Sequence, residues 1–502
     1  MTAACNRALG AARHGTRAPG RHRARAPRSA AWAAVCLALA GCVAGPDYRR
    51  PAVELPATWT LEAPWRTASP ADVVAKGPWW QRYDDPTLAE LERRAVGASP
   101  TLDIAAARLA QARAALDATS AARWPQLTLG VRTTRARISA NRPLSSYGSP
   151  NFATVQNDFI ATFSASYELD LAGRVQRSIE GAEASAEQSM ADLESTRLVL
   201  GADLATAYFN LREADIELDV LDRSVGLQRR ALELIGARHD LGAASGLEVA
   251  QQQAVLDTTL AQVDPLMRQR SVYEHAIATL VGAPAPGFSI APDLREVVPP
   301  AVPLGVPSDV LERRPDVASA ERAMAAANAQ VGVATAAFYP SITLGPTTGG
   351  ESRELTRLFD APSIVWSAGA SLVQPLFDGG RIRANVEFAR AGYDATVASY
   401  RRTVLTAMQE VEDGISGVAR LESALQQAQA AVGSSRRVLD LATARYEGGA
   451  SAYLDVISAQ QGLLASERLA AQLRGQRLLA SVSLVRALGG DWQRPANLLA
   501  SP

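Results

Sequence analysis

The segment WPQLTLG at residues 124–130 recurs as YPSITLG at residues 339–345. Each copy begins 24 residues after a proline, Pro100 in the first case and Pro315 in the second. Further matches keep a constant offset of 207 residues: Arg238/Arg445, Gly242/Gly449, Leu247/Leu454, Val249/Val456, Gln253/Gln460 and Gly282/Gly489. A duplication of this length, over 100–282 and 315–489, predicts a pseudo-symmetric fold in which each half supplies equivalent elements.

The first 41 residues are predicted to be a targeting segment that the mature protein lacks. Seven arginines and no acidic residue precede the apolar run 30–40. This run ends in Leu39-Ala40-Gly41-Cys42, which matches the cleavage signal of bacterial lipoproteins. We therefore expect residues 1–41 to be a lipoprotein signal peptide and Cys42 to carry the lipid. Val43 and Ala44 follow without an aspartate, as in lipoproteins sorted to the outer membrane.

Charge, cysteine content and hydropathy argue against a nucleic-acid-binding protein, a disulfide-stabilised fold and a transmembrane helix in the mature chain. The chain has 51 basic and 51 acidic residues, and removal of the seven signal arginines leaves 44 against 51, a net charge of about −7. We therefore expect no binding to nucleic acid. Cys42 is the only cysteine left after processing, so packing rather than disulfide bonds must stabilise the fold. No run of 18 apolar residues follows the signal, so any crossing of a membrane would have to be made by strands.

Two proline-rich stretches divide the mature chain. Residues 42–86 contain seven prolines and no periodicity, which predicts a lipidated, extended N-terminal strap. Residues 283–307 contain seven more prolines, which prevent a helix from continuing and predict a connector. Repeat 1 then spans 87–282, repeat 2 spans 308–492, and a tail covers 493–502.

Each repeat is predicted to contain one very long helix. Helices over 174–241 and 381–448 have 68 residues each and would be about 100 Å long. Heptad spacing of apolar residues indicates coiled-coil packing of both. The heptad residues are Leu204, Leu211, Leu218, Val225 and Leu232 in the first copy and Val404, Val411, Val418, Leu425, Val432 and Leu439 in the second. Shorter helices, expected over 101–123, 246–281, 316–338 and 453–488, would form a split rod beside each continuous one.

Strands are predicted between the helices, at about 126–136 and 158–170 in repeat 1 and at about 341–348 and 364–374 in repeat 2. Apolar and polar residues alternate in them, as in transmembrane barrel strands with lipid outside and water inside. The alternation alone is equally compatible with a sheet that caps a soluble coiled coil. Four strands cannot close a barrel, and open edges are not tolerated in lipid, so membrane insertion would require a trimer with twelve strands.

Motifs along the whole mature chain resemble one known family. They are GPDYRRP at 45–51, WW at 79–80 with DP at 85–86, ELDLAGR at 168–174, PLFDGGR at 375–381 and ALGGDW at 487–492. Together they resemble the TolC-type outer-membrane factors, and more narrowly the NodT- and OprM-like lipoprotein branch that serves tripartite efflux systems. The resemblance implies an α+β membrane channel-tunnel: a homotrimeric, 12-stranded outer-membrane β-barrel that continues into a long periplasmic α-helical barrel, with an internal two-fold repeat.

The resemblance also implies where other proteins bind. The turns at 241–247 and 448–454 match the periplasmic tips, which adaptor hairpins contact in the family. Glycines permit the turn geometry and small side chains permit close approach, although a purely structural turn would use the same residues. The implied adaptor-contacting residues are Gly242, Ala243, Ala244 and Ser245 in the first tip and Gly449, Ala450 and Ser451 in the second.

A pore constriction is implied just beyond the second tip. Leu454 matches an apolar ring residue, whereas Asp455 and Ser458 occupy two positions where members of the family carry aspartates. Three copies of Asp455 around one axis would favour cations. Tyr446 and Glu248 match a contact between a tyrosine and an acid that holds the entrance shut, and Ser451 replaces an arginine that supports this latch in some members.

The implied function is a passive exit duct for drugs or other small molecules, lipid-anchored and barrel-inserted in the outer membrane of a Gram-negative bacterium and extending into its periplasm. The implied partners are a periplasmic adaptor protein, an inner-membrane RND-type pump and outer-membrane lipid. An enzyme is not expected, because His239 and His275 are the only histidines after the signal and no catalytic, metal or cofactor motif occurs. The remaining alternative is a periplasmic coiled-coil adaptor or structural lipoprotein, although an adaptor would show one hairpin instead of two.

Overall fold

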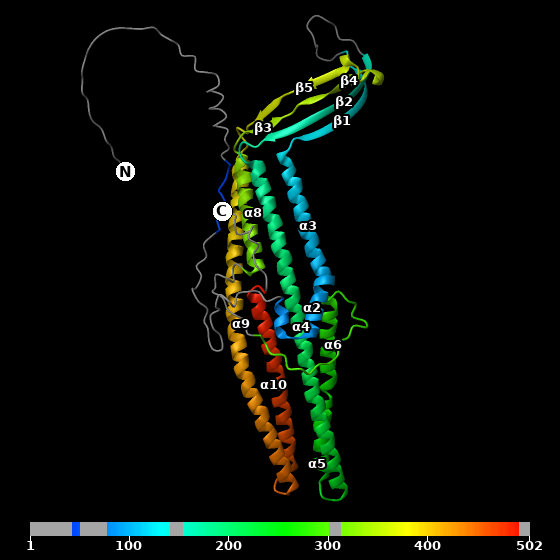
Figure 1. The fold of residues 1–502 in the computed structure, drawn as a ribbon, viewed down its shortest axis with the longest axis vertical. Coiled ribbons are helices and arrows are strands. Elements are labelled where there is room, and N and C mark those ends of the chain that lie inside the picture. Colours follow the sequence, from blue (N-terminus) through cyan, green and yellow to red (C-terminus); the bar gives the residue numbers. More distant parts are fainter. Residues whose placement is uncertain (1–42, 51–77, 141–153, 301–312, 491–502) are drawn as a thin grey trace, which may run out of the picture. The chain divides into compact units, whose positions relative to one another are not determined.

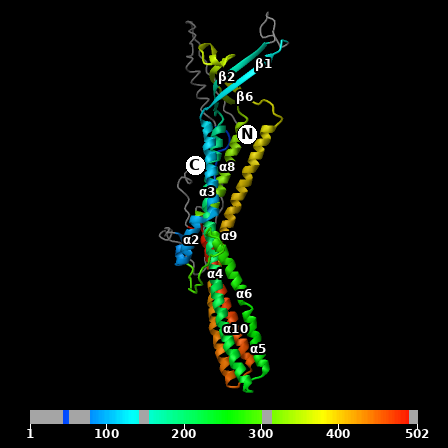
Figure 2. The same cartoon turned by 90° about the vertical axis from the view of Figure 1, so that its right-hand side faces the viewer.

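The computed structural model describes residues 43–50, 78–140, 154–300 and 313–490, all within one compact unit that begins at Val43. The predictions for the signal peptide, Cys42, most of the strap and the tail lie outside these residues. Figure 1 shows the strands at one end of the helices and the helix turns at the other. Figure 2 shows the same separation after a rotation of 90°.

Two long helices dominate the structure, α4 (Arg174–Asp240) and α9 (Arg381–Glu447), with 67 residues each. They end one residue earlier than expected, and their first residues are 207 positions apart. None of the heptad residues is exposed, because this side of each helix packs against neighbouring helices. Coiled-coil packing therefore governs both helices, as the heptads predicted.

Shorter helices lie along the long ones. The first copy contains α3 (Pro100–Ser120), which continues in the 3₁₀ turn η3 (Ala121–Arg123), together with α5 (Gly246–Leu260) and α6 (Val263–Leu280). The second copy contains α8 (Pro315–Ala336) and α10 (Tyr453–Ala487). α4 contacts α3, α5 and α6, whereas α9 contacts α8 and α10 (Figure 1). α4 also contacts α8 and α10, which joins the two copies.

The prediction of one helix over 246–281 is wrong, because α5 ends at Leu260 and α6 begins at Val263. Pro265 explains the break. A proline lacks the N–H that would bond four residues back, and its ring would collide with the carbonyl group there. The corresponding position in the second copy is Gln472, and α10 runs through it without interruption.

Part of the expected strap is helical. Trp79–Tyr83 forms a 3₁₀ helix, η2, and Pro86 begins α2 (Pro86–Ala98). Asp85 accepts hydrogen bonds from the backbone nitrogens of Thr87 and Leu88, so it caps the first turn of α2. Trp79 and Tyr83 are buried in the largest hydrophobic cluster, together with α2 and the middle of α4. The aromatic side chains of η2 therefore pack onto α4.

The strands are all antiparallel. β1 (Gln126–Ile138) pairs along its length with β2 (Thr154–Leu169), in a register that places Leu129 opposite Phe163. The other edge of β2 pairs with β4 (Thr347–Ser352) and then with β3 (Ser341–Leu344). β5 (Ile364–Ser367) pairs with β4, and β6 (Ala370–Val373) pairs with β3.

Each strand predicted in repeat 2 is divided, so the expectations of continuous strands at 341–348 and 364–374 are wrong. Pro346, which has no N–H to donate, lies between β3 and β4, and Gly369 lies between β5 and β6. The two breaks face each other, since the Gly345 nitrogen donates to the Gly369 carbonyl at 3.0 Å. Four strand positions still lie side by side: β1, β2, the pair β3/β4 and the pair β5/β6.

Within the described ranges of the chain, no helix is both long enough and apolar enough to cross a membrane.

Candidate functional site

Two turns at the same end of the helices contain most of the predicted site residues (Figure 1). Gly242 and Gly449 have positive φ angles of 72° and 70°. In the first turn, the nitrogens of Gly242 and Ala243 donate to the carbonyls of His239 and Arg238. Gly449 and Ala450 make the same pair of bonds to Tyr446 and Arg445 in the second. Both helices therefore end in the same glycine-dependent C-cap, which leaves small side chains at the tips.

The helices that follow the two turns begin differently. Ser245 and Glu248 form a capping box, in which the Ser245 nitrogen donates to Glu248 Oε2 at 2.7 Å and the Glu248 nitrogen donates to Ser245 Oγ at 3.3 Å. The N-cap residue of α10 is Ala452, which has no capping side chain. The first residues of α10 therefore depend more on contacts with other helices.

The predicted latch residues lie next to each other. The Tyr446 hydroxyl is 3.4 Å from Glu248 Oε1, and the guanidinium group of Arg238 lies 5.0 Å from the centre of the Tyr446 ring. Burial and the neighbouring carboxylate of Glu248 raise the pKa of Tyr446, so its hydroxyl keeps its proton at neutral pH. Arg238 contacts the tyrosine ring here, whereas Ser451 stands where some members of the resembling family carry an arginine.

The predicted constriction residues share the exposed side of α10. Leu454 is 54% exposed, and its counterpart Leu247 at the start of α5 is 67% exposed. Asp455 and Ser458 are exposed as well, and Ser458 Oγ donates to the Leu454 carbonyl at 2.8 Å. The opposite side of the helix, with Tyr453, Val456 and Ile457, is buried. The structure thus separates a packed face from a face that is open to water or to another chain.

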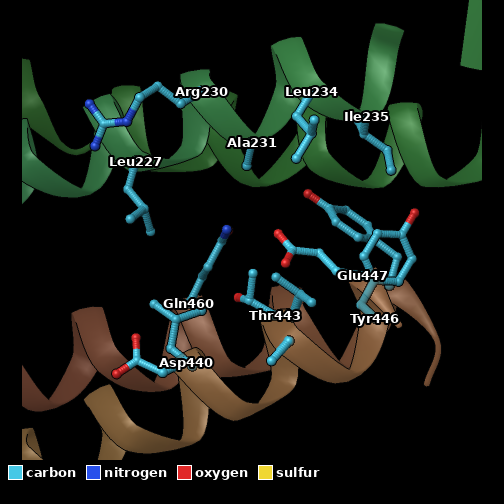
Figure 3. Close-up of a pocket in the computed structure, with 14 residues that line it drawn as sticks. Leu227, Arg230, Ala231, Leu234, Ile235, Asp440, Thr443, Tyr446, Glu447 and Gln460 are labelled. Carbon is cyan, nitrogen blue, oxygen red and sulfur yellow. The ribbon is translucent and has the colours of Figure 1, made fainter. Parts of the chain in front are cut away.

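A cavity of about 460 Å³ lies between α4 and the α9/α10 pair, close to the turns. Figure 3 shows Leu227, Ala231, Leu234 and Ile235 on the α4 side and Thr443, Tyr446 and Gln460 on the opposite side. Most of the lining is apolar. The cavity lies beside a hydrophobic cluster in which Ile235 and Val255 pack against Leu439, Tyr453, Val456 and Ile457, so the two helix pairs are joined by a core next to an unfilled space.

Sequence reasoning missed the polar contact beside this cavity. Tyr453 donates from its hydroxyl to Gln252 Oε1 at 2.8 Å, and both side chains are buried. Gln252 Nε2 in turn donates to the backbone carbonyl of Gln228 at 3.1 Å. Tyr453 and Gln252 are 201 residues apart in the chain, so no local pattern could have paired them.

No group of three histidine, cysteine or acidic side chains that could hold a metal ion occurs in the described part of the chain. Nδ1 of His239 lies 2.9 Å from the Ala244 carbonyl, so this histidine contacts the first turn.

Comparison with known proteins gives consistent results. The family model for outer membrane efflux proteins matches residues 91–283 and 306–490. The toluene efflux pump outer membrane protein TtgF of Pseudomonas putida is 33% identical over 476 residues, which cover 93% of this chain and 97% of TtgF. The outer membrane protein OprJ of Pseudomonas aeruginosa is 31% identical over 467 residues, which cover 93% and 96%. The solved structure of the outer-membrane channel OprN has a TM-score of 0.81 at 30% identity, covering 89% of this chain and 99% of OprN.

Proposed function

The chain belongs to the outer membrane efflux protein family, and we propose that three copies of it form the exit duct of a tripartite efflux pump. It is the outer-membrane component of an efflux system of a Gram-negative bacterium, and it extends into the periplasm. The matching relatives are outer-membrane components, which favours the channel over the alternative of a periplasmic adaptor or structural lipoprotein.

The main observation that supports a trimer is that the sheet of one chain is incomplete. Among the described residues, β1 pairs only with β2, and β5 and β6 each pair with one strand, so both outer edges offer free backbone groups. Apolar side chains on these strands are exposed, with Leu127 at 70% and Trp366 at 77%. Unpaired edges with exposed apolar side chains favour association with further strands and insertion into lipid.

Three chains would satisfy these edges with a barrel of twelve strands, and α3 to α6 together with α8 to α10 would form a helical barrel below it. The two repeats supply equivalent long helices to this barrel, because α4 and α9 have the same length. Light scattering of detergent-extracted protein should give the mass of three protomers. A stable monomer with the same helix content would contradict the shared barrel.

The exposed face of α10 forms the constriction of this duct. Three Leu454 side chains around the axis would exclude water, and three Asp455 carboxylates would attract cations. Ser458 supplies a hydroxyl instead of a second acidic ring, so its contribution to cation preference is small. Tyr446 and Glu248 hold the two helix pairs together on the outer side of the tip.

The glycine-dependent turns are the docking points for the adaptor, which connects the duct to an inner-membrane RND-type pump. Gly242, Ala243, Ala244 and Ser245 form one docking turn, and Gly449, Ala450 and Ser451 form the other. All of them except Ala244 and Ser451 are exposed. Small exposed side chains allow close approach of the helical hairpin of a partner.

Cys42 anchors the chain by its lipid, and this residue lies outside the described ranges. Intact mass of the purified mature protein tests the anchor. Cleavage before Cys42 and addition of about three acyl chains are expected, since more than one chain is needed for stable anchoring. A mature mass without added lipid would exclude this mode of anchoring.

Export itself is tested in the native host. Deletion of the gene, in a strain that lacks its other outer-membrane efflux components, should increase accumulation of a lipophilic fluorescent dye, and the intact gene on a plasmid should restore export. Equal dye accumulation with and without the plasmid would contradict the assignment of this chain to dye efflux.

A further inference from the structure

The polar contact between Tyr453 and Gln252 lies one helical turn deeper than the Tyr446–Glu248 pair, and it contains no charged group. Gln252 follows Glu248 by four residues on α5, so both side chains lie on the same side of that helix. Gln252 is fully buried and Tyr453 is 5% exposed. Burial raises the pKa of the Tyr453 hydroxyl to about 12, so it remains a hydrogen-bond donor at physiological pH.

Gln252 is bonded at both ends of its amide group. Its oxygen accepts from Tyr453 on α10 at 2.8 Å, and its nitrogen donates to the Gln228 carbonyl on α4 at 3.1 Å. Its side chain therefore joins α4, α5 and α10. A glutamine amide both accepts and donates while neutral, whereas an ionised glutamate only accepts.

The two contacts differ in strength. The Tyr446–Glu248 distance of 3.4 Å exceeds the usual range for a hydroxyl donor, and Glu248 also serves the capping box. This pair is partly open to water, which weakens charged contacts. Breaking the Tyr453–Gln252 bond would leave a buried hydroxyl donor and a buried amide oxygen without their partners, which is the more costly event.

We propose that Gln252 is the positioning residue that holds α10 against α4 and α5 in the closed tip, and that it contributes more to closure than the Tyr446–Glu248 contact. This inference rests on the proposed role of the tip as the gate of the duct. The space beside Gln252 would allow its side chain and that of Tyr453 to move when the tip opens. Tyr453 and Gln460 line the adjoining cavity, and Gln228 Oε1 and Gln460 Oε1 have no hydrogen-bond partner among the described residues.

Gln252→Glu tests the inference through pH. Below the pKa of the introduced carboxyl, the protonated acid can still donate to Gln228 and accept from Tyr453, so the tip should stay closed. Above this pKa, the carboxylate has no proton to donate and faces the Gln228 carbonyl, so the tip should open. Burial and the nearby Glu248 should place this pKa above the ordinary glutamate value, within a range accessible to recording.

Titratable and charged groups face this position from each helix that packs against it. They are Glu248 on α5, Tyr446 on α9, Tyr453 on α10 and Arg238 on α4, with Arg230, Asp440 and Glu447 around the adjoining cavity. Gln253→Glu is the matched control, because Gln253 is the next residue on α5 and is exposed. It adds the same charge at an exposed position, where Nε2 of Gln253 donates to Asp257 Oδ1 of the same helix at 2.8 Å instead of bonding to Gln228.

Single-channel recording of the purified trimers between pH 5 and pH 8 decides the question. Gln252→Glu should increase the ratio of open to closed time by about five-fold or more at the upper pH and return to the parent value at the lower pH. Gln253→Glu should follow the parent throughout. Equal pH responses of the two variants, or no response of Gln252→Glu, would overturn the inference.

Tyr453→Phe provides a second test that does not depend on a buried charge. It removes only the hydroxyl group, and Tyr446→Phe is its counterpart at the outer contact. Tyr453→Phe should increase open time more than Tyr446→Phe, and the reverse order would overturn the inference. Parent trimers that form no channel at all would contradict the proposed function instead, so the two failures are distinguishable.

Discussion

Nη2 of Arg177 on α4 lies 2.7 Å from the Asp47 carboxylate, although the two side chains differ greatly in burial. The Arg177 side chain is 6% exposed and that of Asp47 is 88% exposed. Arg177 also contacts Glu180 at 2.8 Å and donates from Nε to the Ala44 carbonyl at 3.3 Å. One buried guanidinium group thus fixes residues 44–47 onto α4.

This asymmetry predicts different costs for the two residues. Arg177→Ala removes several charge-assisted bonds at once and should destabilise each chain by about 3 kcal/mol. Asp47→Asn keeps the arginine and its other partners, and an exposed ion pair contributes under about 1 kcal/mol. Heat-induced dissociation of the proposed trimer, monitored by light scattering, measures the destabilisation by each substitution. Similar destabilisation by the two substitutions would show that the burial of Arg177 does not increase its contribution to stability.

Two glycines at the ends of α6 and α10 are predicted to tolerate no side chain. A Cβ atom at Gly282 would overlap the Ala98 carbonyl oxygen, and one at Gly489 would overlap that of Arg313. Gly282→Ala should cost about 3 kcal/mol, because overlap adds to the cost of a positive φ angle.

Gly242→Ala is the matched control for this prediction. Gly242 has nearly the same φ angle and open space around it, so about 1 kcal/mol is expected. Chemical denaturation of the two variants gives the difference. Equal decreases in the free energy of unfolding would mean that the backbone around Gly282 shifts to relieve the overlap without destabilising the fold.

Ion selectivity is predicted to depend on Asp455. Asp455→Asn should reduce the preference for cations, and Ser458→Asp should increase it by adding a second acidic ring. Reversal potentials in a potassium chloride gradient measure both changes. If neither substitution shifts the reversal potential, the constriction lies elsewhere in the duct.

Stability is predicted to depend on pH through Glu213 on α4. Burial, and then the nearby Glu217, raise the pKa of Glu213 from 4.5 to about 7. The folded state therefore binds this proton more tightly than the unfolded state, so the stabilisation is complete below about pH 4.5 and is lost as the pH rises through about 7. Glu213→Gln should raise the melting temperature relative to the parent at pH 8 more than at pH 5. Glu233→Gln, an exposed control on the same helix, should show no such difference.

The sequence predicted the elements whose cause is local. Heptads and the offset of 207 residues gave the two long helices to within one residue, and the turn glycines gave their ends. Breaks caused by single residues are not predicted by the periodicity, because Pro265 and Pro346 lie within segments whose pattern continues on both sides.

Residues of the proposed gate could be predicted only where they match a motif of the family. Tyr446 and Glu248 lie together as the resemblance implied. The repeat offset pairs Gln253 with Gln460 and indicates nothing about the neighbouring Gln252. The function of Gln252 depends on Tyr453, a partner from a distant part of the chain. Such pairs follow from the packing of α5 against α10 and not from spacing.

Single-channel recording of the parent and of a Tyr446→Phe/Glu248→Ala double variant tests the central claim, a duct closed at its tip, most directly. Both proteins should produce protein-dependent current steps in planar bilayers. The double variant should have the higher conductance, because it loses the outer contact and the capping box of α5. Folded protein that gives the same conductance for the parent and the double variant would contradict a tip held shut by this contact, and a double variant that gives no current steps would contradict the duct itself.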